Sequence, residues 1–169
     1  MRGRVIRFPS KGWPARPTTD FAREALFNIL DNRLDYGEIR ALELFGGTGI
    51  HSIELASRGC RDITYVERHR DSAKFLRRLS NELQLPIAVF QQDVISFIKS
   101  ASAVWDYIFA DPPYDMPGLL EFPEAVLSAD IMAPQGIFVL EHTSKLTFDR
   151  QRGFQEARHY GQSVFSFFG

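Results

Sequence analysis

Short apolar runs alternate with longer segments of helical periodicity along most of the chain. Apolar runs typical of buried strands lie at residues 41–45, 63–67, 87–91, 105–110 and 136–141. Helical periodicity marks the segments between them, at 49–59, 69–83 and, more briefly, near 94–100 and 119–128. Gly59 and Pro86 stand where the first two of these helices should end. This alternation predicts a mostly parallel sheet covered by helices on both faces.

The two ends of the chain depart from this alternation. Residues 16–32 form one predicted helix, whose first turn follows a proline. Its candidate N-caps are Thr18, Thr19 and Asp20. Near the C-terminus, residues 153–160 and 162–168 flank Gly161 with no helix between them, which is typical of a hairpin. One strand near the end is therefore expected to run antiparallel to the others.

Length and composition indicate one globular domain. The chain has 169 residues, of which 44% are hydrophobic, enough for a core of normal size. Cys60 is the only cysteine, which excludes an internal disulfide and favours a reducing, cytoplasmic setting. The histidines are scattered without ligand spacing, so we expect no metal. We find no signal peptide and no apolar run long enough to span a bilayer, and we expect a monomer without membrane contact.

Charge is distributed unevenly, although the net charge is only −1. Residues 1–19 carry five basic groups and no acidic one, whereas residues 101–130 carry six acids and no base. We therefore divide the chain into a basic N-terminal arm, residues 1–19, and a folded domain, residues 20–169. The arm can dock on phosphates or can be a solvated segment with skewed charge, and charge alone does not decide.

A glycine-rich turn follows the first apolar run, in the sequence ELFGGTG at residues 43–49. Gly47 and Gly49 allow a tight turn with peptide N–H groups near a ligand, although an ordinary strand-to-helix turn uses the same residues. Ser52 stands where the dinucleotide-binding fingerprint needs its third glycine. Glu43 would repel a pyrophosphate at this turn and attract a cationic ligand.

Further acids follow the next two apolar runs, and ligands of such sheets bind at the carboxyl ends of the strands. Glu67 ends one run, where a carboxylate can accept both hydroxyls of a ribose, and Asp93 can reach the exocyclic amine of an adenine. A cationic nucleoside without phosphate is S-adenosylmethionine, whose groups match this order. The predicted cofactor-binding residues are Glu43, Phe45, Gly47, Gly49, Glu67, Arg68, Asp93 and Val94.

The sequence FADPPYD ends the fourth apolar run with a carboxylate, two prolines and an aromatic ring. Two prolines are a common exit from a sheet, but this order also suits methylation of an exocyclic amine. A carboxylate and a rigid carbonyl can hold both N–H bonds of the amine, while an aromatic ring stacks on the base. The predicted catalytic residues are Asp111, Pro112, Pro113 and Tyr114. Glu141 can line the same crevice, but we interpret it as a solvated strand end.

Together, ELFGGTG and DPPY resemble the class I methyltransferases that modify exocyclic amines. Longer stretches resemble the RsmD family of bacterial 16S ribosomal RNA guanine-N2 methyltransferases: RPTTDFAREALFNIL, LELFGGTGIHSIELASRG, FADPPY and GQSVFSFF. The resemblance runs from about residue 2 to the end. It implies a Rossmann-like α/β fold with a mostly parallel seven-stranded sheet, S-adenosylmethionine as cofactor, and a guanine of the small ribosomal subunit as substrate.

An RNA substrate gives the basic arm a role. Its cations can straddle phosphates and Trp13 can stack on an unpaired base, although Trp13 can equally anchor the arm on the core. Arg16 can instead close over the carboxylate of the cofactor. The predicted RNA-binding residues are Arg2, Arg4, Arg7, Lys11, Trp13 and Arg16.

Two alternatives stay open at this point. The first keeps the chemistry and changes the acceptor to adenine N6 in RNA or DNA, or to a glutamine amide of a protein. Asp111 counts against the glutamine, because enzymes directed to it usually carry asparagine there. Adenine enzymes usually need an added target-recognition domain, for which the length leaves no room. The second alternative is a non-catalytic RNA-binding module, against which the intact Asp111, Tyr114 and Gly47 count.

Overall fold

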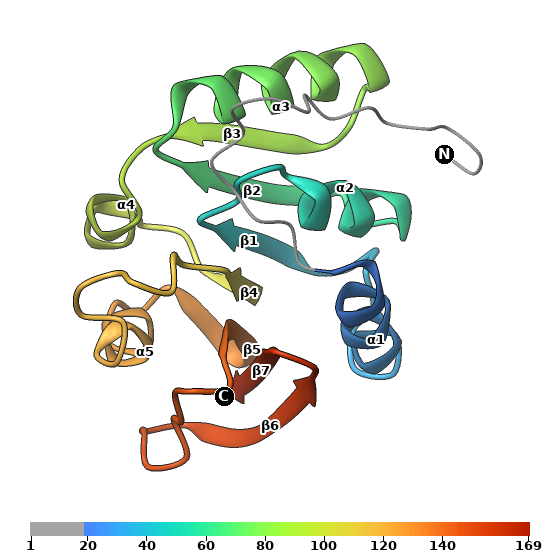
Figure 1. The fold of residues 1–169 in the computed structure, drawn as a ribbon. Coiled ribbons are helices and arrows are strands. Elements are labelled where there is room, and N and C mark those ends of the chain that lie inside the picture. The colour runs from blue at the N-terminus through green and yellow to red at the C-terminus, as the bar shows by residue number, and fades with distance from the viewer. Residues whose placement is uncertain (1–18) are drawn as a thin grey trace.

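The computed structural model describes residues 19–169, in which seven strands form one sheet of order β3-β2-β1-β4-β5-β7-β6 (Figure 1). The strands are β1 (Arg40–Leu44), β2 (Asp62–Glu67), β3 (Ile87–Gln91), β4 (Trp105–Ala110), β5 (Met132–Thr143), β6 (Phe154–Tyr160) and β7 (Ser163–Phe168). The helices are α1 (Asp20–Leu30), α2 (Ile50–Ser57), α3 (Arg70–Leu83), α4 (Val94–Ser100) and α5 (Phe122–Leu127).

The strand directions confirm the predicted sheet. The first five strands pair in parallel, whereas β7 runs antiparallel to both of its neighbours, β5 and β6. The reversal occurs at Gly161, which has a φ of 65°. β5 begins earlier than predicted, because Met132 pairs with Trp105 before the register shifts and Ile137 pairs with Tyr107. The residues in the shift, APQG, have turn chemistry, so their sequence gives no strand signal.

Apolar side chains on the two faces of the sheet build two separate cores. One core packs α1 and α2 against the sheet through residues such as Leu26, Phe27 and Leu55. The other packs α4 and α5 against the opposite face through Phe97, Phe122 and others. Figure 1 shows these helices on opposite sides of the sheet, so the prediction of helices on both faces is confirmed. Among residues 19–169, no helix has the length and apolar content needed to cross a membrane.

Local sequence signals fix where the first two helices begin. Of the candidate caps, Thr19 is the N-cap of α1, and its hydroxyl oxygen accepts the Ala22 N–H at 3.2 Å. Gly49 is the N-cap of α2 with a φ of 73°. A Cβ atom at Gly49 would lie 2.7 Å from the side chain of Leu76 on α3, so a substitution would strain the backbone and displace that side chain.

The sheet has its topological switch point between β1 and β4. From β1 the chain proceeds to β2 and β3 on one side, and it then crosses back to place β4 on the other side. The loops that follow β1 and β4 therefore diverge at the carboxyl ends of these strands and leave a crevice between them. The glycine-rich turn and the FADPPYD loop are these two loops.

Candidate active site

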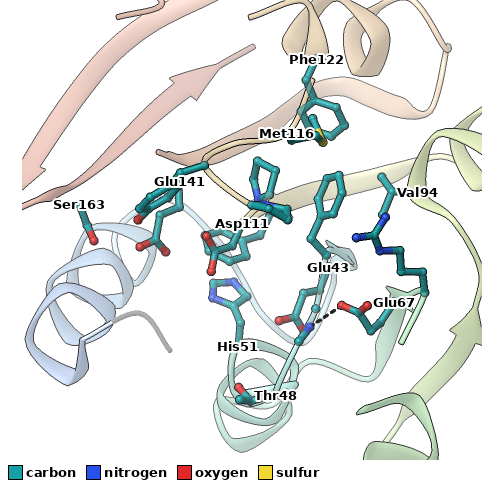
Figure 2. A pocket seen from close by; sticks show the side chains of 18 of the residues that line it. Glu43, Thr48, His51, Glu67, Val94, Asp111, Met116, Phe122, Glu141 and Ser163 are labelled. Carbon is teal, nitrogen blue, oxygen red and sulfur yellow. Dashed lines mark hydrogen bonds between the residues drawn. The ribbon is translucent and has the colours of Figure 1, made fainter. Parts of the chain in front are cut away.

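A cleft of about 1140 Å³ lies over the carboxyl ends of the central strands. The loops after β1, β2, β3 and β4 surround it, as predicted, and the far wall comes from β5 and the β6–β7 turn (Figure 2). Of the predicted catalytic and cofactor-binding residues, Gly49 alone is outside the wall. Those in the wall are Glu43, Phe45, Gly47, Glu67, Arg68, Asp93, Val94, Asp111, Pro112, Pro113 and Tyr114.

A buried tyrosine shapes the glycine-rich turn from below. Tyr65 on β2 donates its hydroxyl to the Gly47 carbonyl at 2.8 Å. A Cβ atom at Gly46 would lie 2.1 Å from the Tyr65 ring, so this position requires glycine. Gly47 has a φ of 49°, and Phe45 holds 56°, which a bulky side chain adopts only under strain. The sequence indicates Gly47 and Gly49 but not Gly46, because the need at Gly46 comes from a ring on the neighbouring strand.

Glu43 is buried in the cleft wall, where Ser52 holds it in place. The Ser52 N–H donates to Glu43 Oε2 at 3.0 Å, and the Ser52 hydroxyl donates to the same oxygen. Burial raises the pKa of Glu43 to about 8, although the two hydrogen bonds from Ser52 lower it. The charge of Glu67 raises it further. The serine that departs from the dinucleotide fingerprint thus orients the carboxyl beneath the turn.

Glu67 connects the end of β2 to the glycine-rich turn. Its Oε2 accepts the Gly47 N–H at 3.0 Å, the contact dashed in Figure 2, and its Oε1 accepts the His69 N–H at 2.8 Å. Each carboxylate oxygen has a second lone pair, so Glu67 can also accept two ribose hydroxyls without releasing the turn. Arg68 follows it in the cleft wall and is exposed.

The part of the cleft near β3 combines one acid with apolar side chains. Asp93 is exposed and caps α4, where its Oδ1 accepts the Ser96 N–H at 3.0 Å. Val94 is buried beside it, and Phe45 packs edge-to-face with a ring centroid 5.4 Å from that of Phe122. Apolar wall residues that the sequence alone did not single out are Ile95, Met116 and Phe122. Met116 lies in a loop, whereas Ile95 and Phe122 lie in the first turns of the short helices α4 and α5, where periodicity gives little signal.

Asp111 stands directly after β4 and next to the cofactor side of the cleft. Its backbone N–H donates to the Leu44 carbonyl at the end of β1 at 3.3 Å, which ties the FADPPYD loop to the glycine-rich turn. The pKa of Asp111 is raised well above its usual range by burial, by Glu141 and by Glu43. Burial and the two neighbouring acids therefore favour the protonated form of Asp111, and a cationic ligand would favour the ionised form.

The remaining FADPPYD residues form a stiff turn at the cleft edge. Pro112 is buried, and the Met116 N–H donates to the Pro113 carbonyl at 2.9 Å. The two fixed φ angles restrict the backbone that follows Asp111. Tyr114 lies in the cleft wall with 42% of its surface exposed.

Glu141 is a cleft residue, and its interpretation as a solvated strand end was wrong. β5 continues to Thr143, so Glu141 lies inside the sheet opposite Phe165 of β7. It is 1% exposed and lines the cleft beside Asp111 (Figure 2). The sequence did not show this, because the apolar run ends at the glutamate whereas the strand does not.

His51 also lines the cleft, although its isolated position in the sequence gave no reason to select it. Its ring stacks on Phe109 with centroids 3.8 Å apart, and its Nε2 lies 3.0 Å from the Tyr107 hydroxyl. Burial, with the Arg23 charge, lowers the pKa of His51 to about 3, so the ring is neutral. Between residues 19 and 169, no group of three or more His, Cys, Asp or Glu side chains could hold a metal ion.

The six predicted RNA-binding residues lie outside the described part of the chain. Their role therefore stays a prediction. The same applies to the division into an arm and a domain at residue 19.

The sheet order, the glycine-rich turn after β1 and the cleft at the switch point define a Rossmann-like fold of the class I methyltransferases. Residues 1–169 match the family described as "Conserved hypothetical protein 95", and the chain belongs to that family. Curated relatives carry the name of the RsmD protein, which confirms the resemblance drawn from the sequence.

The relatives named for ribosomal RNA are similar over part of their length. "Ribosomal RNA small subunit methyltransferase D" of Buchnera aphidicola is 32% identical over 59% of this chain, which spans only 50% of that relative. "Putative rRNA methyltransferase YlbH" of Bacillus subtilis is 29% identical over 83% of this chain and 78% of its own. A "tRNA1(Val) (adenine(37)-N6)-methyltransferase" of Pasteurella multocida is 33% identical over 57% of this chain and 38% of its own.

Solved structures support the fold. A hypothetical protein of Thermus thermophilus has a TM-score of 0.82 at 27% identity and covers 99% of this chain and 94% of its own. The Thermus thermophilus 16S rRNA N2 G1207 methyltransferase RsmC, in complex with AdoMet and guanosine, has a TM-score of 0.71 at 23% identity. The latter comparison covers 94% of this chain and 44% of RsmC.

Proposed function

We propose that this chain transfers a methyl group from S-adenosylmethionine to the N2 amine of a guanine in the 16S ribosomal RNA of the small subunit. The observation that carries the proposal is the cleft in which Asp111 faces the glycine-rich turn and the acids of β1 and β2. Relatives named for ribosomal RNA methylation, among them two named for the small subunit, support the substrate. Such a substrate implies a cytoplasmic location.

The side chains in the cleft fit S-adenosylmethionine from one end to the other. Glu43 suits the cationic methionine part, and Glu67 suits the ribose hydroxyls. The Asp93 carboxylate suits the adenine amine, and Val94 and Phe122 offer apolar surface for the ring. Bound S-adenosylmethionine supplies an electrophilic methyl group on a sulfonium. The RsmC structure, solved with AdoMet in the same fold, supports this assignment.

The residues after β4 hold and orient the amine. Asp111 and the carbonyl of Pro112 accept its two N–H bonds, which draws the nitrogen lone pair out of the ring system and toward the methyl group. Tyr114 stacks on the base and fixes its plane. As the N–C bond forms and the S–C bond breaks, the nitrogen gives up one proton. Ionised Asp111 is a good acceptor for it, because its surroundings raise its pKa.

A second candidate acceptor is adenine N6, because a relative named for tRNA adenine-N6 methylation also matches. In both cases the methyl group is transferred to an exocyclic amine held by Asp111. The two candidates differ in the base that carries this amine. We favour guanine because the chain resembles the RsmD family of guanine-N2 methyltransferases, and because relatives named for ribosomal RNA cover more of this chain, up to 83% for YlbH against 57% for the adenine enzyme.

The deciding experiment incubates the protein with tritiated S-adenosylmethionine and small ribosomal subunits that lack base methylation. The RNA is then digested and the labelled nucleoside is identified. Label in N2-methylguanosine supports the proposal, whereas label in N6-methyladenosine selects the second candidate. Absence of label in both nucleosides, with cofactor binding intact, refutes a small-subunit RNA substrate.

The Asp111→Ala variant tests the assignment of the amine site. We expect methyl transfer to fall by roughly 100-fold or more, since one holder of the amine is lost, while cofactor affinity stays within a few-fold. Asp115→Ala removes another acid of the same loop and is the matched control. A large loss of cofactor affinity in Asp111→Ala would mean that Asp111 belongs to the cofactor side.

The basic arm is tested by salt dependence. Reversal of charge at Arg2 and Arg4 should weaken binding to the small subunit and make the plot of log affinity against log salt shallower by about 1 to 2. Reversal at Arg78, an exposed residue of α3, is the control. An unchanged slope for Arg2 and Arg4 would remove the arm from the RNA surface.

A further inference from the structure

We propose that Glu141 reads the N1–H group of the target guanine, so that Glu141 and Asp111 together select guanine over adenine. The proposal rests on the proposed methyl transfer and deepens it by naming the residue that chooses the base. Glu141 is not among the catalytic and cofactor-binding residues predicted from the sequence.

The sheet places the two carboxyl groups side by side. Ala110 of β4 is in register with Leu140 of β5, so the residues that follow them, Asp111 and Glu141, are neighbours on adjacent strands. Both line the cleft, and in Figure 2 their side chains lie next to each other beyond Glu43. The Glu141 charge also contributes to the raised pKa of Asp111, which fits a short separation.

The acceptor side of the cleft is built around this pair. His51 lies below it, stacked flat on Phe109, and its ring is neutral because its pKa is lowered to about 3. Ser163, at the start of β7, lies on the far side of Glu141 in Figure 2. The pair is thus part of a ready-made recess in which a base can meet two carboxyl groups.

The hydrogen-bonding edges of the two purines explain why two carboxyl groups select guanine. Guanine presents two adjacent donors, N1–H and the N2 amine, whereas adenine presents its N6 amine beside an N1 atom that only accepts. Ionised carboxyl groups accept and cannot donate. When Asp111 accepts a hydrogen bond from the amine, Glu141 can accept one from guanine N1–H. With adenine in the same place, Glu141 would face the lone pair of N1. A buried carboxylate opposed to a lone pair is costly, which is how a site rejects the wrong base.

The test changes the base and Glu141 independently. Small subunits are reconstituted on 16S RNA in which the methylated guanine is kept or replaced by 2-aminopurine, which retains the amine but has an acceptor at N1. Single-turnover methyl transfer is measured for the wild type, for Glu141→Gln and for Glu121→Gln, which makes the same change at another acid of the cleft wall. Thermal unfolding and cofactor binding show whether each variant is folded.

The wild type should disfavour 2-aminopurine by roughly 10- to 100-fold, the effect expected for one hydrogen bond to a charged group. Glu141→Gln should lose most of this preference, since its amide oxygen can still accept guanine N1–H while its N–H₂ can donate to N1 of 2-aminopurine. Glu121→Gln should keep the wild-type preference. Equal rates of the wild type on both bases, or an unchanged preference in folded Glu141→Gln, overturn the role of Glu141. Absence of guanine methylation by the wild type instead refutes the proposed function itself.

Discussion

Binding of the proposed cofactor should tighten as pH rises, because Glu43 must ionise to attract a cation. Burial raises the pKa of Glu43 to about 8, even though Ser52 donates two hydrogen bonds to it. At pH 7 the carboxyl is therefore mostly protonated in the free protein. A cationic ligand beside it favours the ionised form and lowers its pKa, so binding at pH 7 releases a proton.

The size of the effect follows from the ionised fraction. With a pKa of about 8, roughly 1% of Glu43 is ionised at pH 6, about 10% at pH 7 and about 90% at pH 9. If the ionised form alone binds tightly, the apparent affinity rises close to tenfold per unit up to about pH 7 and levels off near pH 9. The complex formed at pH 7 should release about 0.9 proton per site.

Calorimetric titration with S-adenosylmethionine between pH 6 and pH 9 measures this, in pairs of buffers with different ionisation enthalpies. The Glu43→Gln variant is the matched control and should lose this pH dependence, since the amide does not titrate. A neutral nucleoside, 5′-methylthioadenosine, should bind the wild type with little dependence on pH. The reasoning is refuted if Glu43→Gln keeps the wild-type slope, or if the neutral nucleoside shows the same slope.

Three further predictions concern the same turn. Ser52→Ala removes one hydrogen-bond donor to Glu43, so Glu43 ionises less readily. Cofactor affinity at pH 7, measured by calorimetry, should fall several-fold, which corresponds to the loss of about 0.5–1.5 kcal/mol for one hydrogen bond. Gly46→Ala forces a methyl group into the Tyr65 ring, and it should lower the stability by about 1–3 kcal/mol in urea unfolding and abolish cofactor binding. Glu43→Gln should unfold at a higher temperature than the wild type by a margin that grows from pH 5 to pH 9. The stability that protonated Glu43 provides is complete below its unfolded pKa and is lost as pH rises through about 8.

The sequence predicted most of the fold because the local signals agreed with one another. Apolar runs, helical periodicity and the reversal at Gly161 each correspond to an element of the structure. Thr19 was one of three candidate caps, and the choice among neighbouring polar residues depends on a single hydrogen bond. The early start of β5 was missed because Met132 pairs across a bulge of turn residues. Long-range pairing, which a local pattern cannot report, decided that boundary.

The candidate site divides in the same way. Asp111 and Glu67 could be selected from the sequence because they directly follow or end strands whose carboxyl ends must meet at one edge. The bond between Ser52 and Glu43 joins a helix to a strand, and its partners could not be paired from the sequence. Glu141 was misread because the sequence shows where an apolar run ends, whereas its burial depends on β7 pairing beyond that point.

The cleft gathers Glu43 of β1, Asp111 directly after β4 and Glu141 of β5, an arrangement that is costly for ionised groups. Burial and the neighbouring acids raise the pKa values of Glu43 and Asp111. A cation in the cleft favours the ionised forms of these acids, and ionised Asp111 accepts one N–H bond of the amine. A neutral nucleoside cannot do this. The charge of the proposed cofactor therefore both secures its own binding and prepares the amine site, which favours a sequence in which the cofactor binds before the base.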